Sequence, residues 1–265
     1  MRYLRQPGFL LAGFAVLLAV VAAAAPGLLA THDPFASVPA ERLLGPSGDH
    51  WFGTDNLGRD VYSRVVHGAR LSLVAAALAV AVGVCAGALV GLLSGFVGGR
   101  VDFVIMRFVD VLIAVPGILL ALIVVASLGF GPLPIAIGVG LGAAGSYARV
   151  MRSEVLRIRG EEYVEAARTL GARGPAIAFQ HVLPNAARPI VAMAALELGQ
   201  AVLSVSALTF LGFGAPPPSP EWGALVAAGR DFVAVTPSMS ILPGIVILVV
   251  VLAVNRIARS IGDQS

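Results

Sequence analysis

The sequence predicts an all-α integral membrane protein with six transmembrane helices and both termini in the cytoplasm. The composition places the chain in the membrane: 58% of its 265 residues are hydrophobic and only 12% are charged, whereas soluble domains carry about 25% charged residues. The mean hydropathy of +0.90 agrees with this assignment. The uneven distribution of arginine between alternate loops gives the orientation.

Six apolar segments are long enough to cross a bilayer, because a hydrocarbon core about 30 Å thick requires about 20 apolar residues per helix. They are residues 7–30, 71–99, 103–128, 133–148, 189–213 and 239–255. Pro132 and Pro134 separate the third span from the fourth, and proline beside glycine there indicates a tight turn at the membrane surface.

Arginine sets the orientation, since cytoplasmic loops are enriched in basic residues. All 18 basic residues are arginine, and with the N-terminus inside, 13 of them, including Arg2 and Arg5, fall in inner segments. The chain therefore divides into an inner stub with the first span (1–30), an outer segment (31–70), a five-span core (71–258) containing an inner loop at 150–188, and an inner tail (259–265). The N-terminal sequence also resembles a cleavable signal peptide, an alternative that leaves the other spans in the same orientation.

Both outer segments are short. The first contains HWFGTDNLGRDVYSRVVHGARLSL, which predicts a turn and a short amphipathic helix leading into the second span, capped by Thr54 or Asp55. DNLGRD lacks the glycine position and distal glutamate of a calcium-binding loop. The second outer loop carries Pro216 to Pro218 before Trp222. Because prolines stiffen loops and tryptophan favours the membrane interface, we expect a rigid outer rim there.

Glycine occupies every fourth position of the second span, at Gly83, Gly87, Gly91 and Gly95. On a helix this spacing gives a stripe without side chains, which allows close helix packing in lipid. The stripe can pack within this chain or against a second transmembrane subunit, and the sequence favours neither. Cys85, the single cysteine, lies in the same apolar run, so we expect it to be buried.

Few polar residues fall within the predicted spans. Asp110 follows Arg107 by three residues, one helical turn, which predicts an ion pair between them. Glu197 lies deeper, and shares a helical face with Gln200 and Ser204. Charges at membrane depth usually face a cavity or a partner. We therefore expect these three residues to line a pore; the alternative is a hydrogen-bonded contact between helices.

The residues argue against several classes of function. The chain contains no lysine, so it cannot carry the nucleotide-binding loop G-x-x-x-x-G-K-[ST], whose lysine binds the terminal phosphates. It has no H-E-x-x-H motif and no G-x-S-x-G serine, and no catalytic residue can be assigned. Its histidines, at His32, His50, His67 and His181, show no metal-ligand spacing, so we expect no metal site. The net charge of +3 reflects topology rather than nucleic-acid binding.

The inner loop is a long charged stretch between apolar spans. Its apolar and charged residues recur at helical spacing, which predicts an amphipathic helix–turn–helix. Gly171 is suited to end the first helix, Gly174 and Pro175 to begin the second, and Pro184 to end it. Such a helix lies on the membrane surface or binds in a partner's groove. The expected apolar face is Leu156, Tyr163, Ala167 and Leu170, and the polar face is Glu154, Arg157, Glu161, Glu165 and Arg168.

Within this loop, EAARTLGARGPAIAFQHVLP resembles the EAA loop of ABC importer permeases. The matching residues are Glu165, Ala166, Ala167, Gly171, Leu183 and Pro184, while His181 stands where the family has isoleucine. HVLPN resembles the dipeptide, oligopeptide and nickel branch, in particular the second (C-type) permease of the pair. The segments FGTDNLGRDVYSRVVHGARLSL, MRFVDVLIAVPGILLAL, SALTFLGFGAPPPSPEWG and LPGIVILVVVLAVN are similar to that branch too, so the resemblance extends over the chain from about His50.

The resemblance implies a permease subunit of an ATP-driven importer in the bacterial inner membrane, for peptides or a related solute. Its partners would be a homologous second permease, two ABC ATPase subunits or one fused ATPase, and an extracytoplasmic substrate-binding protein. ATP and magnesium would be used by the ATPase, and this chain would hold no cofactor. The EAA helix would couple ATP hydrolysis to transport, with Glu165 contacting a basic residue of the ATPase and Gly171 permitting the turn.

A passive channel or an ion-driven transporter is the alternative class. It fits less well, because the sequence shows no inverted repeat with broken helices and few charges within the spans.

Overall fold

A computed structural model describes residues 7–262, apart from the side chains of Arg168 and Ile261. Arg2, Arg5 and the end of the predicted inner tail lie outside the described residues. Within 7–262 the regular structure is helical and includes no β-strand. The longer helices are α1 (Pro7–Ala24), α2 (Val61–Val97), α3 (Gly99–Ala114), α4 (Gly117–Leu128), α5 (Pro132–Arg159), α8 (Leu183–Phe210) and α10 (Ser238–Gly262). Shorter ones are η2 (Pro26–Leu28), η3 (Pro39–Glu41), α6 (Glu162–Thr169), α7 (Gly174–Ala176), η4 (Ile177–Val182), α9 (Trp222–Gly229) and η5 (Arg230–Phe232).

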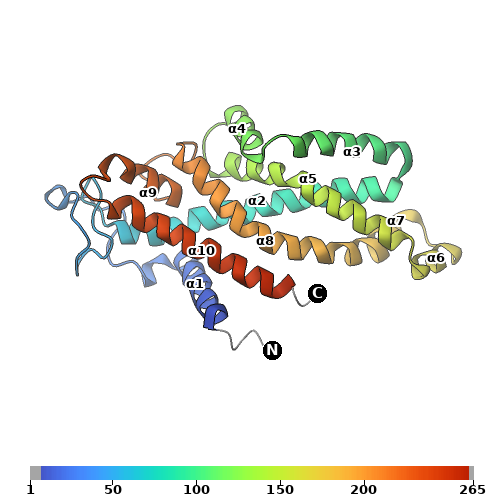
Figure 1. Ribbon diagram of the computed structural model, residues 1–265, viewed down its shortest axis with the longest axis horizontal. Helices are drawn as coiled ribbons and strands as arrows, with labels where there is room; N and C mark the ends of the chain where they lie inside the picture. The colour runs from blue at the N-terminus through green and yellow to red at the C-terminus, as the bar shows by residue number, and fades with distance from the viewer. Residues whose placement is uncertain (1–6, 263–265) are drawn as a thin grey trace.

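The helices are arranged lengthwise around α2, α5 and α8, which contact one another in all three pairings. Figure 1 shows residues 25–60 and α9 at one end of the molecule and α6 and α7 at the other. α1 packs on α10, while α3 and α4 pack on α5. Within the described residues, five helices are long and apolar enough to cross a membrane, and the bent pair α3–α4 makes a sixth crossing if it counts as one span. The predicted all-α membrane class is thus confirmed, with five crossings, or the predicted six when the bent pair is counted.

The third span is broken, whereas the sequence predicted one continuous helix over 103–128. α3 and α4 meet at 94°, with Val115 and Pro116 between them. Pro116 has no backbone N–H to donate to the preceding turn, so the helix ends before it. Gly117 then begins α4, close to Gly142 of α5.

α2 is one helix of 37 residues, so the predicted short outer helix is not separate from the second span. The N-cap prediction of Thr54 or Asp55 is wrong: Asp60 is the cap, and its Oδ2 accepts a 2.7 Å hydrogen bond from the Ser63 N–H. Asp55 instead orders the preceding turn, accepting hydrogen bonds from the backbone N–H groups of Leu57 and Arg59.

α8 also extends further than predicted. A helical run of 37 residues reaches from Gly174 to Phe210, whereas the sequence predicted a helix end at Leu183-Pro184. The run passes Pro184 through a wider π-helical turn, η4, in which the Leu183 N–H bonds to the Ala178 carbonyl. In an α-helix the ring of Pro184 would clash with a carbonyl one turn earlier, and the wider turn makes room for it.

The glycine stripe packs inside the chain, against α5. A Cβ on Gly87 would lie 2.5 Å from the Ala144 carbonyl oxygen and 2.5 Å from the Tyr147 Cβ. At Gly91 it would collide with the Ala148 carbonyl oxygen and the Met151 side chain. The α2 and α5 backbones therefore meet at a distance that only glycine allows.

Three further expectations are wrong. Cys85 is exposed on the surface of the chain, because the buried stripe occupies a different face of α2. Asp110 pairs with Arg149 of α5 at 3.0 Å, while the Arg107 guanidinium lies over the Phe103 ring one turn earlier.

The third wrong expectation concerns Trp222, which we expected at the membrane interface. Its side chain is buried within the protein and only 1% exposed. Its indole N–H donates to the Val65 carbonyl at 2.8 Å, so the ring locks α9 onto α2. The proline loop before Trp222 thereby belongs to the packed end of the molecule that lies opposite α6, where the Pro218 carbonyl accepts a hydrogen bond from Arg64.

Candidate functional site

The EAA segment, residues 160–184, forms the tip of the molecule at the α6 end (Figure 1). α5 ends at Arg159 with Gly160 as its C-cap, and α6 follows from Glu162 as an eight-residue helix. Val164 is fully buried and holds α6 against Ile158 and Ile177. Gly171 has φ of +85°, a left-handed conformation that glycine adopts without strain, and it ends this helix as predicted.

The apolar face expected for this segment is largely exposed. Leu170 is 87% exposed, Tyr163 45% and Leu156 42%, whereas the buried anchor, Val164, was not on the predicted face. Glu165 and Ala166 are exposed on α6. Arg157 pairs with Glu154 at 2.8 Å and with Glu161 at 3.4 Å, so these three residues of the predicted polar face lie together. The side chain of Arg168 is outside the described part.

The exposed Tyr163 on α6 and Leu170 directly after it, beside acidic residues, give this tip the character of a contact surface for another macromolecule. A hollow next to it is lined by Arg157, Tyr163, Asn185 and Arg188, among others. Leu183 and Pro184 lie in the helical run that leads from this surface into α8. The predicted EAA residues are therefore together at one tip of the fold.

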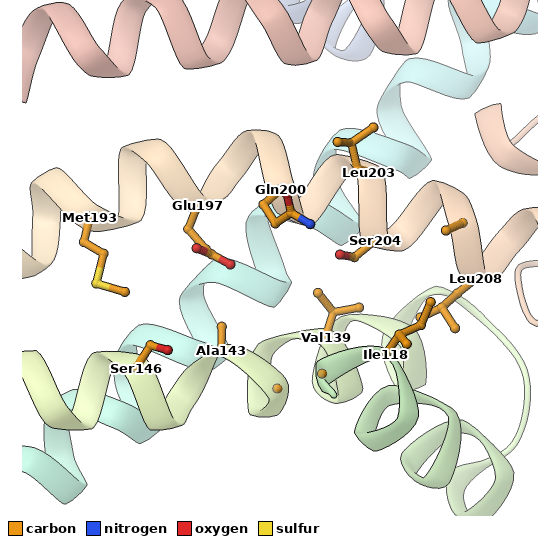
Figure 2. A pocket seen from close by; sticks show the side chains of 13 residues that line it. Ile118, Val139, Ala143, Ser146, Met193, Glu197, Gln200, Leu203, Ser204 and Leu208 are labelled. Atoms are coloured by element: carbon orange, nitrogen blue, oxygen red, sulfur yellow. The ribbon is translucent and has the colours of Figure 1, made fainter. Parts of the chain in front are cut away.

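A cavity of about 450 Å³ lies between α4, α5 and α8. Figure 2 shows Glu197, Gln200 and Ser204 of α8 on its wall, with Ala143 and Ser146 of α5 opposite. All three residues that the sequence placed on one face of a helix thus share this cavity. The residues that line the cavity all belong to the described part of the chain. Among them, Glu197 is the only one with an ionisable side chain.

The remaining wall is apolar or small. Gly117 and Gly142 bring the α4 and α5 backbones together, and Val139, Met193 and Leu208 line the cavity around them. Sequence reasoning missed Ser146 and Met193. No signal pointed to Ser146, because which face of α5 turns toward α8 depends on packing with α2, more than 50 residues earlier in the chain. The cavity can hold a small polar molecule. Its wall offers that molecule one carboxylate, from Glu197, and several hydrogen-bonding groups.

Comparison with known proteins decides the family. Residues 87–263 match the family described as the inner membrane component of binding-protein-dependent transport systems. The chain belongs to this family.

Two curated relatives match almost the whole chain. It is 37% identical over 263 residues to the dipeptide transport system permease protein DppC of Alkalihalophilus pseudofirmus, covering 99% of this chain and 86% of the relative. It is 39% identical over 263 residues to the glutathione transport system permease protein GsiD of Pectobacterium atrosepticum, covering 99% and 87%. This chain is accordingly a multi-pass inner-membrane permease of an ABC transporter, and not itself the ATPase.

Two solved structures share the fold. The inward-facing MetNI methionine ABC transporter matches with a TM-score of 0.57 at 20% identity, over 74% of this chain and 95% of that one. An amino acid ABC transporter solved with histidines matches with a TM-score of 0.57 at 15% identity. This match covers 76% of this chain and 94% of that one. About three quarters of this chain therefore has the fold of an ABC transporter permease.

Proposed function

We propose that this chain forms half of a pore that imports short peptides, with the cavity beside Glu197 on the transport path. The curated relatives are named for transport of a dipeptide and of glutathione, both short peptides with an ammonium group, carboxylates and amides. A cavity of about 450 Å³ falls in the range of small-molecule sites. Its one carboxylate suits an ammonium group, and its serine and glutamine side chains suit amides.

The proposal extends to the EAA segment, which contacts an ATPase subunit in the cytoplasm. The exposed Glu165, Tyr163 and Leu170 supply charge and apolar area for that contact. The observation that carries the proposal is the continuous helical run from Gly174 to Phe210, which joins the EAA segment to Glu197. ATP binding closes the ATPase pair, and movement of the docked tip shifts the α8 wall of the cavity.

In this arrangement the tip at α6 faces the cytoplasm, and residues 25–60 with α9 face outward. A homologous second permease completes the pore, two ATPase subunits or one fused ATPase use ATP and magnesium, and a soluble binding protein delivers the peptide from outside.

The test is peptide uptake by proteoliposomes that contain the complete transporter. Glu165→Lys reverses the charge at the tip and should lower both uptake and ATPase co-purification at least about tenfold, with normal membrane insertion. Asp231→Lys, an equally exposed charge reversal at the opposite end, is the matched control and should retain ATPase binding. Unimpaired uptake by the Glu165→Lys, Gly171→Asp double variant would overturn the proposal.

A further inference from the structure

Two histidines and an aspartate meet where the outer segment packs on the N-terminus of α2. Their positions in sequence, His32, His50 and Asp60, gave no indication of a ligand set. In the structure, one donor atom from each of the three lies within 4.8 Å of the other two. His50 Nδ1 is 2.9 Å from Asp60 Oδ1, and His32 Nδ1 is 4.0 Å from Asp60 Oδ2.

These separations fit the coordination sphere of a metal ion. Zinc binds histidine nitrogen and carboxylate oxygen at about 2.0–2.2 Å, which in a tetrahedral site places neighbouring donor atoms roughly 3.3 Å apart. The two distances to Asp60, 2.9 Å to Oδ1 and 4.0 Å to Oδ2, are close to that value, and one ligand atom from each residue lies within 4.8 Å of the other two. The centroids of the His32 and His50 rings lie 4.8 Å apart. A shared ion would replace the present hydrogen bonds of His50 Nδ1 with Asp60 Oδ1 and of His32 Nδ1 with Thr31 Oγ1.

The residues around the cluster hold two of the donors in place. Glu41 Oε2 lies 3.4 Å from His50 Nε2, so the second ring nitrogen can donate to a carboxylate while Nδ1 faces the cluster. Metal-binding histidines are commonly oriented in this way. Asp60 is fixed by the hydrogen bond that it accepts from the Ser63 N–H, and the Ser63 Oγ accepts from the His32 N–H at 2.9 Å.

Access to the cluster is from one side. The Asp60 side chain is 1% exposed and that of His50 10%, whereas the His32 side chain is 43% exposed. An ion can therefore arrive past His32 and keep a water molecule on that side as its fourth ligand, the usual arrangement with three protein ligands.

We infer that His32, His50 and Asp60 form a binding site for a divalent ion of the zinc and nickel class. Imidazole nitrogens with one carboxylate suit these ions better than calcium or magnesium, which prefer oxygen ligands. The bound ion ties the chain after α1 to the cap of α2, and so stabilises the outer end of the molecule. This site is separate from the cavity and from the EAA segment, and it goes beyond the proposed transport function.

The experiment is zinc titration by calorimetry of the full chain in lipid nanodiscs, purified with a tag that contains no histidine and stripped with a chelator. Wild type should bind one zinc ion per chain, and its melting temperature should rise on binding. His32→Ala removes the exposed ligand and should weaken zinc binding about tenfold or more, with the rise in melting temperature lost. His67→Ala is the matched control, because His67 lies on α2 outside the cluster, with Nδ1 against the Ser63 carbonyl.

Asp60→Asn keeps a side-chain oxygen to cap α2 but loses the charged ligand, so it should fold and bind zinc more weakly than wild type. The absorption of bound cobalt, used as a spectroscopic substitute for zinc, should report a low coordination number in wild type and should be weaker in His32→Ala and Asp60→Asn at the same cobalt concentration. Wild type without saturable zinc binding would overturn the inference, as would His32→Ala and Asp60→Asn that both bind zinc like wild type. Peptide uptake is not needed for any of these measurements.

Discussion

Arg152 of α5 forms a bidentate ion pair with Asp102 of α3. The Nε–Oδ1 and Nη2–Oδ2 distances are 2.5 and 2.6 Å. The Ser94 hydroxyl of α2 donates to the same carboxylate at 2.5 Å. Three helices thus converge on one carboxylate near the α6 end, where α2 turns into α3. Paired hydrogen bonds of this kind are stronger and more directional than a single ionic contact.

Replacing Arg152 by lysine should destabilise the chain, because lysine cannot form both hydrogen bonds at once. The side chains are 32% and 16% exposed, so solvent screening limits the expected loss to about 1 kcal/mol. Thermal unfolding in detergent of Arg152→Lys, Asp102→Asn and the double variant measures the coupling between them. Strict additivity of the two single effects would show that the pair contributes nothing.

Gly91→Ala should be clearly destabilising, because a Cβ there meets the Ala148 carbonyl and the Met151 side chain. Overpacking of this kind costs about 1–3 kcal/mol. Gly13 of α1 is the matched control, since a Cβ there meets nothing within 4 Å; Gly13→Ala should be neutral or stabilising by up to about 1 kcal/mol. Equal melting temperatures for the two variants would contradict the close α2–α5 contact.

Glu197→Gln tests the polar wall of the cavity. Glutamine keeps the shape of the side chain and removes the only charge among the lining residues. If the carboxylate binds the substrate ammonium group, uptake at low peptide concentration should fall by about 10- to 100-fold. This factor corresponds to the usual free-energy contribution of a hydrogen bond to a charged group.

Leu196→Ala, on the exposed side of the same helix, should transport peptide like wild type. Undiminished uptake by Glu197→Gln would place the substrate elsewhere.

Glu221 makes stability depend on pH. It is fully buried between the proline loop and α9, and burial raises the pKa of its carboxyl, against the opposing effect of a hydrogen bond from the Ala215 N–H. The folded protein therefore holds this proton more tightly than the unfolded chain does. Its contribution to stability is greatest below the unfolded pKa of about 4.3, and it is lost as pH rises through the raised folded value.

Glu221→Gln is permanently neutral, so it should be more stable than wild type at pH 8 and lose that advantage as pH falls toward 4. Melting temperatures across this range measure the difference. An advantage that does not change with pH would assign the effect to packing rather than to ionisation.

Much of the fold follows from local sequence. Apolar length predicts the spans, the spacing of Gly83 to Gly95 predicts a close helix contact, and Gly171 predicts a helix end, because each signal acts within a few residues. The shared face of Glu197, Gln200 and Ser204 is likewise a property of one helix. That these residues meet a cavity depends on how α4 and α5 pack opposite them.

The errors arose where distant residues compete with local ones. Asp110 pairs with Arg149, 39 positions later in the chain, and not with Arg107 one turn away. The indole of Trp222 donates a hydrogen bond to the Val65 carbonyl, 157 positions earlier. His32 and His50 come together only because the segment between them folds back on the start of α2. Helical periodicity contains no information about such long-range tertiary contacts.

The run from Gly174 to Phe210 has a mechanical consequence. At 1.5 Å per residue its 37 residues extend about 55 Å, well beyond the hydrocarbon thickness of about 30 Å. Glu197 lies partway along this run, between the EAA segment and Phe210. Under the coupling proposed above, a push of a few ångströms on the α6 end would tilt this helical run, and the cavity wall at Glu197 would move with it.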